Sequence, residues 1–164
     1  MAVLTIRKVP DPVLRQKATR VNSFDRSLQK LVKDMVETLR AAPGVGLAAP
    51  QVGVPMRVIV IGMPEQEEVA YINPEVIRRK GERVLEEGCL SLPGYIGQVK
   101  RSEAITVKAL NLEGKEIRVK ANDLLAQVLE HEIDHLNGVL YIDKLEGMDK
   151  PRKVEREDSE PQRV

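Results

Sequence analysis

Residues 122–138 read NDLLAQVLEHEIDHLNG, and this stretch predicts the helix around which the rest of the chain must pack. Apolar and histidine side chains recur three and four residues apart, which places them broadly on one helical face: Leu124, Leu125, Val128, His131, His135 and Leu136. Asn122 or Asp123 can cap the start, and Gly138 follows the expected end. Both histidines therefore continue the apolar stripe and are expected to point inward.

The same helix contains the pattern HExxH, from His131 to His135 with Glu132 after the first histidine. Side chains four residues apart share a helical face, so two imidazoles can bind one metal ion and the glutamate can act as a base beside it. A histidine on an apolar face is also commonly a core residue with a hydrogen-bond partner. The chain has 2 histidines in all, both in this pattern, which favours the metal hypothesis.

Composition bounds the class of protein. The 164 residues are 42% hydrophobic, enough for one core, but only 2% aromatic, which leaves few rings on which nucleic-acid bases could stack. The net charge of +1, from 26 basic and 25 acidic residues, gives no sign of a nucleic-acid binder. The charged, proline-containing N-terminus does not resemble a signal peptide, and no apolar run approaches the ~18 residues of a membrane span. A soluble, cytoplasmic protein is expected.

The remaining pattern predicts a second helix and several strands. A helix is expected within residues 22–44, started by a cap at Asn22 or Ser23 and stopped by Pro43-Gly44. Residues 57–62 (RVIVIG) predict a short buried strand, residues 69–94 predict extended segments, and residues 104–121 predict a hairpin around Asn111–Gly114. Turns are expected at Asn73-Pro74, Lys80-Gly81 and Pro93-Gly94.

These elements predict an α+β fold, with short antiparallel strands around the central HExxH-bearing helix in a single compact domain. We expect residues 1–150 to form this domain, starting with an irregular arm over residues 1–22. Residues 151–164 contain four basic and four acidic residues and are expected to be a solvated, disordered tail.

The single cysteine, Cys89, lies in EEGCLSLPG. A lone cysteine is most often a small buried hydrophobe. Here one thiolate and two imidazoles would make three protein ligands, the number that catalytic tetrahedral sites use while the fourth position stays open. A structural zinc site needs four ligands, and the chain has no further Cys or His. The composition therefore favours a catalytic site over a structural one.

Residues 44–53 read GVGLAAPQVG. Gly44, Gly46 and Ala49 fit a loose dinucleotide-binding pattern, but that pattern should follow a strand and open a helix, and here it follows a helix and runs into Pro50. Two interpretations remain: a tight turn packed on the core, or a backbone edge against which an extended substrate lies. In the second case Gln51 can offer an amide N–H to an oxyanion.

Taken in order, GVGLAAPQ, EGCLS and HEIDH resemble the three signature segments of the peptide deformylase family, and the resemblance extends from the N-terminal arm through the HExxH helix. It implies a metal-dependent hydrolase that removes the N-formyl group from the N-terminal formylmethionine of newly made polypeptides and releases formate. The implied partners are N-formylmethionyl nascent peptides, with the ribosome near its exit tunnel as a further candidate. The balanced charge of the tail gives ribosome binding no support.

By this resemblance Cys89, His131 and His135 bind one divalent metal, Fe²⁺ in the cell, which Zn²⁺, Ni²⁺ or Co²⁺ can replace. The metal lowers the pKa of its bound water, and Glu132 takes the water proton and passes it to the leaving amine. The Gln51 side chain and the Leu90 backbone N–H stabilise the negative charge on the formyl oxygen.

The resemblance also implies how the peptide binds. The extended substrate would lie along the backbone of Val45 and Gly46, and the methionine side chain would enter a pocket with walls from Leu90, Leu124 and Val128. Plain core packing of these three residues is nearly as good an interpretation. Many relatives carry an arginine where this chain has Ile96, which puts one contact to the peptide in question. Either Glu87 or Asp134 can orient a ligand histidine, and a surface or salt-bridge role is open for both.

Two other functions fit parts of the pattern. A zinc peptidase also uses HExxH and needs a third ligand downstream, for which Glu146 is available. A non-catalytic metal-binding or redox-sensing protein would hold metal equally well, but it needs neither Glu132 nor Gln51. Cleavage of an unformylated peptide would support the peptidase, and metal binding without turnover would support the sensor.

Overall fold

The computed structural model describes residues 2–146 and 150–153, and in this part of the chain it confirms an α+β fold in one compact domain. Two α-helices are α1, Arg26–Arg40, and α2, Asp123–Leu136. The strands of the described residues are β1 (Gly46–Ala48), β2 (Val58–Ile61), β3 (Val69–Lys80), β4 (Arg83–Cys89), β5 (Leu92–Arg101), β6 (Ala104–Leu110), β7 (Glu116–Asn122) and β8 (Arg152–Lys153). Short 3-10 helices are η1 (Pro12–Arg15), η2 (Ala49–Val52) and η3 (Tyr141–Lys144).

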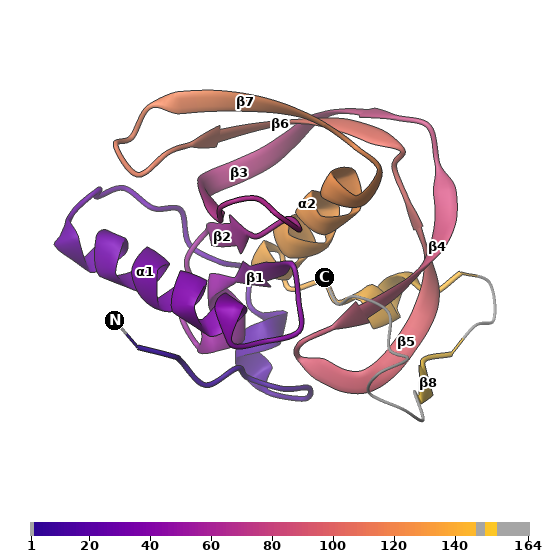
Figure 1. Cartoon of the computed structure of the whole chain (residues 1–164). Helices are drawn as coiled ribbons and strands as arrows, with labels where there is room; N and C mark the ends of the chain where they lie inside the picture. Colours follow the sequence, from indigo (N-terminus) through magenta and orange to yellow (C-terminus); the bar gives the residue numbers. More distant parts are fainter. Residues whose placement is uncertain (1, 147–149, 154–164) are drawn as a thin grey trace.

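Antiparallel pairing joins the strands into two sheets. Among the described residues, one sheet has the order β1-β2-β3-β6-β7 and the other the order β4-β5-β8. The predicted hairpin is the β6–β7 pair, whose connecting turn is closed by Asn111 and Gly114. The helix α2 lies centrally in Figure 1, with β1 and β2 on one side and the β4–β5 hairpin on the other.

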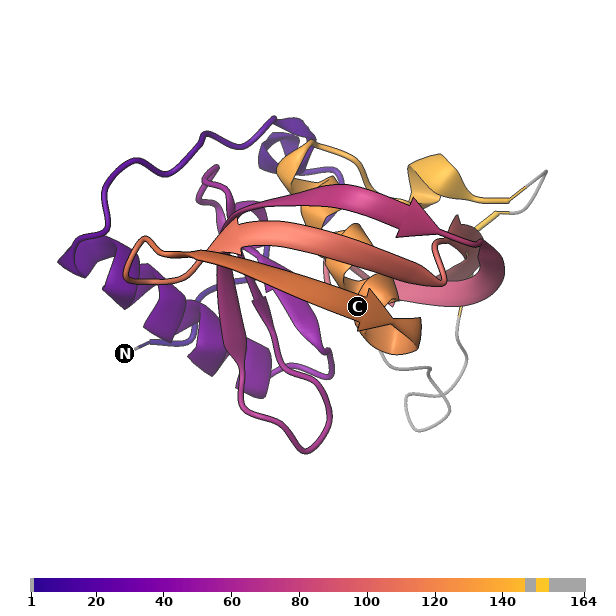
Figure 2. The same cartoon turned by 90° about the horizontal axis from the view of Figure 1, so that it is seen from above.

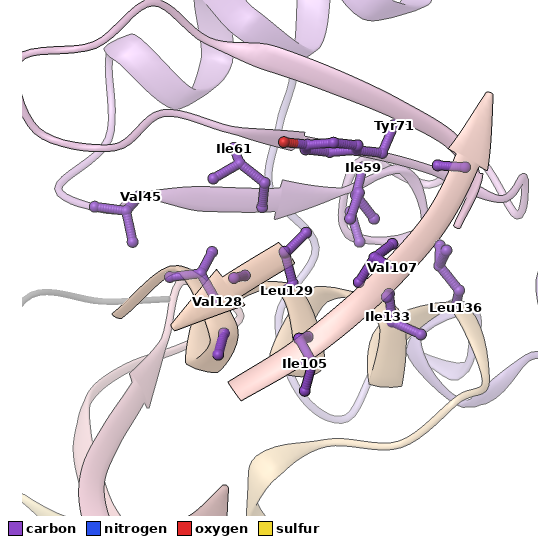
Figure 3. Packing of buried hydrophobic residues seen from close by; sticks show 14 of the residues in the cluster. Val45, Ile59, Ile61, Tyr71, Ile105, Val107, Val128, Leu129, Ile133 and Leu136 are labelled. Carbon is purple, nitrogen blue, oxygen red and sulfur yellow. The ribbon is translucent and has the colours of Figure 1, made fainter. Parts of the chain in front are cut away.

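The strand β2 is buried on both faces, as its unbroken apolar sequence predicts. Because successive side chains of a strand point to opposite faces, Val58 and Val60 pack with α1, whereas Ile59 and Ile61 pack with α2. Figure 3 shows Ile59 and Ile61 above Leu129 and Val128 of α2. The two helices therefore cover opposite faces of one sheet, and Figure 2 shows how β3, β6 and β7 curve over α2.

Three local predictions were wrong. The cap of α1 is Asp25, which has extended backbone and whose carboxylate accepts from the N–H of Leu28. The pair Asn73-Pro74 does not end a strand: β3 continues through it with a register shift, and Asn73 adopts φ 51°. The turn after Cys89 falls at residues 90–91, and Pro93-Gly94 lies within β5, where Gly94 supplies a φ of +83°.

The N-terminal arm is irregular apart from η1, as predicted, but backbone hydrogen bonds hold it to the core. Arg7 N–H donates to the carbonyl of Gln51, and Ala18 N–H donates to that of Leu136. Of the predicted tail, residues 154–164 lie outside the described residues. Its first residues are ordered, since Arg152 and Lys153 pair with β5. No helix in the described ranges is long and apolar enough to cross a membrane.

Candidate metal centre

Three potential ligand atoms converge in the interior, where the end of β4 meets α2. Sγ of Cys89 lies 3.3 Å from Nε2 of His135, which lies 3.2 Å from Nε2 of His131. All three ligand atoms lie within 4.8 Å of one another, and all three residues are buried. The HExxH periodicity places both histidines on the buried face of α2, and the β4–β5 hairpin brings Cys89 to them.

The donor set fits one metal ion. In a tetrahedral site with metal–nitrogen and metal–sulfur bonds of ordinary length, ligand atoms lie roughly 3.3–3.6 Å apart, close to the separations found here. Thiolate and imidazole are ligands for Fe²⁺, Zn²⁺, Ni²⁺ and Co²⁺ alike, so the donor types leave the choice of metal open. The described residues add no other Cys or His to the cluster, which leaves a coordination position for a substrate or water.

A buried carboxylate orients one of the histidines. Oε1 of Glu87 lies 2.5 Å from Nδ1 of His131, and this contact turns Nε2 of the ring toward Cys89 and His135. The Glu87 carboxylate also accepts from Arg101 at 2.5 and 3.0 Å and from Gln127 at 3.1 Å. Arg101 in turn donates to Asp134 at 2.7 Å. The network therefore assigns the contact with the histidine to Glu87, while Asp134 contacts Arg101 and Lys144 at its outer end.

The pKa values of the two imidazoles are shifted in opposite directions. Burial disfavours a charged His131, but the carboxylate of Glu87 and the neighbouring Cys89 and Glu132 outweigh burial and raise the pKa of His131. Burial and the adjacent His131 lower the pKa of His135. Burial also opposes ionisation of Glu87, yet His131 and Arg101 hold the pKa of that carboxyl well below its usual range. A metal ion that binds this site must displace the His131 proton.

Glu132 is enclosed and lacks a hydrogen-bond partner among the described residues at either carboxylate oxygen. Burial raises its pKa to about 7, although a bound divalent cation would add positive charge nearby and lower the pKa again. Its carboxylate lies against the backbone of β1, where a Cβ built on Gly46 would fall 2.6 Å from Oε2 of Glu132 and 2.8 Å from Cγ1 of Val128. Only glycine fits between β1 and α2 at this point without a shift.

Gln51 comes from η2, directly after β1, and is completely buried. Its Oε1 accepts from the N–H of Ala48 at 2.9 Å, and its Nε2 donates to Oγ of Ser91 at 3.0 Å and lies 3.7 Å from Sγ of Cys89. The amide group therefore faces the cluster of ligands. Leu90 lies in the turn that follows Cys89, outside the pairing of β4 with β5.

The predicted pocket residues fall into two groups. Val45 and Val128 are buried in the core cluster that surrounds α2, with Leu124 packed against it. Leu90 belongs to the cluster on the α1 side, and a Cβ built on Gly44 would lie 2.9 Å from its Cδ1. Leu90 thus does not pack in one cluster with the other two wall residues.

Sequence reasoning missed Arg101, Gln127 and Ser91 as parts of the site. Each is polar and buried, and each contacts a residue distant in sequence. Ile96 is paired in register with Arg152 of β8, whose guanidinium contacts the carboxylate of Glu86. An arginine therefore does lie beside Ile96, but it comes from the C-terminal strand. No local pattern in the sequence indicates the buried polar contacts or the position of Arg152 beside Ile96.

Comparisons with known proteins agree on one family. The family model described as polypeptide deformylase matches residues 3–151. A peptide deformylase of Dehalococcoides mccartyi is 47% identical over 165 aligned residues, which cover 100% of this chain and 99% of that protein. The crystal structure of peptide deformylase from Thermotoga maritima superposes with a TM-score of 0.87 at 42% identity, covering 90% of this chain and 100% of that chain. The enzyme from Synechococcus elongatus in complex with actinonin gives a TM-score of 0.86 at 40% identity and covers 90% and 81%. The chain therefore belongs to the polypeptide deformylase family.

Proposed function

We propose that Cys89, His131 and His135 hold the metal ion with which this deformylase works. The chain is a peptide deformylase, a metal-dependent hydrolase that removes the N-formyl group from new polypeptides. The observation that carries the proposal is the approach of the three ligand atoms within 4.8 Å, beside a buried carboxylate that has no partner among the described residues. When bound, the ion supplies Lewis-acid chemistry that makes a water nucleophilic near neutral pH.

Glu132 is proposed as the group that moves the proton. Its carboxylate takes a proton from the water that attacks the formyl carbon and delivers it to the amine nitrogen as the C–N bond breaks, so that formate and a free amino terminus leave. Two features support this role. The carboxylate is adjacent in sequence to one ligand and fully buried, and no described residue engages its oxygens.

Gln51 and Leu90 are proposed to stabilise the formyl oxygen as negative charge grows on it. The Gln51 amide lies 3.7 Å from the sulfur of Cys89, and Leu90 is the next residue after that cysteine. Two N–H groups near the same ligand can donate to one oxygen, and such donors act most strongly where water is excluded. Both residues are buried.

The peptide is proposed to bind as an extended strand along β1. This strand is at the edge of its sheet and is paired with β2 on one side. Gly46 is its first residue, and Val45 directly precedes it. Val128 lies against Gly46 and Leu124 packs on the same cluster, which supports them as walls for the methionine side chain. Leu90 would bound the pocket from the α1 side.

The two rival functions fit less well. A peptidase site would need Glu146 as a ligand, but its carboxylate is 3.5 Å from Nζ of Lys100, and it is absent from the ligand cluster in the described residues. A metal sensor would leave the burial of Glu132 without a function, and an unpartnered carboxylate in the interior is costly.

We further propose Fe²⁺ as the metal in the cell, with Zn²⁺, Ni²⁺ or Co²⁺ as replacements, since all suit the donor set. We also propose that the enzyme acts in the cytoplasm on nascent chains at the ribosome, because its substrate is made there. Residues 1–150 are proposed as the catalytic domain and residues 151–164 as a charged tail, whose first strand, β8, docks on β5.

The test is formate release from formyl-Met-Ala-Ser by protein purified without oxygen and reloaded with Fe²⁺, with Glu132→Ala as the comparison. We expect turnover by the wild type and none by the variant, while both bind one metal ion per chain. Unformylated Met-Ala-Ser is the control for peptidase activity and should stay intact. Metal-loaded wild type that releases no formate would contradict the proposal, and so would a Glu132→Ala variant with normal turnover.

A further inference from the structure

The completely buried Gln51 and Ser91 form a side-chain pair beside the ligand cluster, although 40 residues separate them in sequence. Nε2 of Gln51 donates to Oγ of Ser91 at 3.0 Å. Ser91 follows Cys89 by two residues, and its backbone N–H lies 3.5 Å from the cysteine sulfur. The pair thus connects the segment after β1 with the segment that carries the thiolate ligand.

The hydrogen bonds fix the orientation of the Gln51 amide. The N–H of Ala48 can only donate, so the group it meets at 2.9 Å must be the carbonyl oxygen of the amide. Nε2 therefore faces Ser91 and Cys89. Of its two N–H groups, one donates to Oγ of Ser91, and the other faces Sγ of Cys89, which lies 3.7 Å from Nε2.

The N-terminal arm fixes the backbone of both residues from outside the site. Arg7 N–H donates to the carbonyl of Gln51 at 2.6 Å, and Val9 N–H donates to the carbonyl of Ser91 at 2.9 Å. Residues two apart on an extended arm thus hold the two carbonyls. With both backbones held, the hydrogen bond between the side chains decides where the second N–H of Gln51 points.

We propose that Ser91 is a positioning residue, whose hydroxyl orients the Gln51 amide toward the formyl oxygen; this inference rests on the proposed role of Gln51 as an oxyanion donor. A donor contributes to rate only when it is already aimed at the position where charge develops. Without Oγ, the buried amide loses one of its three hydrogen-bond partners and can rotate away. Ser91 acts through Gln51 and need not touch the substrate.

The substitution Ser91→Ala tests this role, because it removes Oγ but keeps the backbone N–H near Cys89. We expect kcat to fall ~10- to 100-fold with KM unchanged, since a misplaced transition-state group affects kcat and kcat/KM equally. The metal content and the absorption spectrum of the Co²⁺-loaded protein should match wild type. In Zn²⁺-loaded, ¹⁵N-labelled protein, the Gln51 side-chain amide signals should shift and exchange with solvent faster.

The matched control is Ser102→Ala, which removes another buried hydroxyl, bonded at 2.9 Å to Glu130 rather than to Gln51. Its kcat and the Gln51 amide signals should not change. A double-mutant cycle completes the test: in a Gln51→Ala background, Ser91→Ala should reduce kcat by less than twofold.

The outcomes separate the two proposals. If Gln51→Ala keeps the wild-type kcat, the proposed oxyanion role of Gln51 is wrong. If Gln51→Ala loses ~10²–10³ in kcat while Ser91→Ala keeps the wild-type rate, only the positioning role is wrong. The positioning role would also be wrong if Ser91→Ala lowered kcat as much in the Gln51→Ala background as in the wild type, since Ser91 would then act without Gln51.

Discussion

Oε1 of Glu87 lies 2.5 Å from Nδ1 of His131, and Arg101 donates to both oxygens of the same carboxylate. The β4–β5 hairpin thus supplies two things to α2: the cysteine at its end, and the group that orients one of the ligand histidines. Glu87 is fully buried, so its negative charge is balanced inside the protein by Arg101 and by whatever positive charge His131 or a metal provides.

Glu87→Gln should weaken metal binding. The amide keeps the shape of the carboxylate, but it loses the charge and points an NH₂ group at a donor, either Arg101 or His131. We expect the metal affinity to fall ~10- to 100-fold and the free energy of unfolding to fall by about 3 kcal/mol, because a buried guanidinium loses a partner. Competition with a chromophoric chelator and urea unfolding measure the two quantities.

Asp134→Asn is the matched control for Glu87→Gln. Asp134 accepts from Arg101, whereas Nδ1 of His131 is held by Glu87, so the orienting hydrogen bond survives. The metal affinity should stay within about twofold of wild type. An equal loss of affinity in both variants would show that Arg101, and not the contact between Glu87 and His131, controls the site.

Gly46→Ala should remove activity by displacing Glu132. The new methyl group would fall 2.6 Å from Oε2 of that residue and 2.8 Å from a Val128 methyl, and α2 cannot move away without disturbing the core. Overpacking of this kind typically costs 1–3 kcal/mol, and we expect kcat/KM to fall at least ~10²-fold. Steady-state formate release and thermal unfolding measure the two effects.

Gly62→Ala provides the comparison for this prediction. The added methyl group would meet the flexible side chain of Glu68 at 3.2 Å, which can give way. Activity should be unchanged. Wild-type kcat/KM in Gly46→Ala would mean that β1 and α2 separate more easily than their packing indicates.

The sequence allowed the α+β class, the helix with HExxH, the β6–β7 hairpin and the grouping of Cys89, His131 and His135 to be predicted, because each leaves a local signal. The helical periodicity predicted that both histidines point inward, and the single cysteine was the remaining candidate for a thiolate donor. The Glu87–Arg101 pair left no such signal. The two residues are 14 positions apart and are not cross-strand partners, since Glu87 pairs with Gly97 and Arg101 pairs with Arg83 in the register of β4 against β5.

Turn chemistry explains the errors around Asn73 and Gly94. Asn-Pro and Pro-Gly normally mark turns, but here both pairs lie inside long strands, at points where the register of pairing is interrupted. At Asn73 the tertiary structure overrides the local preference: its side chain accepts from Val21 N–H at 2.8 Å and donates to Val21 carbonyl at 2.9 Å. This contact with the arm is 52 residues away in sequence, beyond the reach of local patterns.

Asn73→Ala should therefore destabilise the fold without affecting chemistry. The substitution removes both hydrogen bonds to Val21 and places alanine at φ 51°, a conformation that asparagine tolerates better. The two buried backbone groups of Val21 that lose their partner cost ~1–3 kcal/mol each, so we expect the free energy of unfolding to fall by about 2–6 kcal/mol. Urea titration measures this, and kcat at low temperature should match wild type.

Asn111→Ala is the control that tests whether the loss of stability depends on the buried location of the hydrogen bonds or only on the loss of an asparagine. The Asn111 side chain also accepts two backbone hydrogen bonds, from Glu113 and Lys115, but in the exposed β6–β7 turn, where water can replace it. The loss of stability should stay below about 1 kcal/mol. If Asn73→Ala and Asn111→Ala lowered the free energy of unfolding equally, burial of the hydrogen bonds between Asn73 and the arm would add no stability beyond that of an exposed turn.

Metal binding should stabilise one part of the molecule more than the rest. The proposed ligands come from β4 and α2, so the ion would link the hairpin to the helix, while α1 carries none of them. At a free Zn²⁺ concentration about 1,000 times Kd, binding adds about 4 kcal/mol. For a chain of this size that raises Tm by about 8–16 °C. Glu132→Ala should show the same rise in Tm, because Glu132 is not among the proposed ligands, whereas Cys89→Ser should lose most of it.

Amide hydrogen exchange tests where the metal stabilises the molecule. Protection should rise in β4, β5 and α2 well before α1 changes. A uniform rise across all elements would mean that the chain unfolds only as one unit.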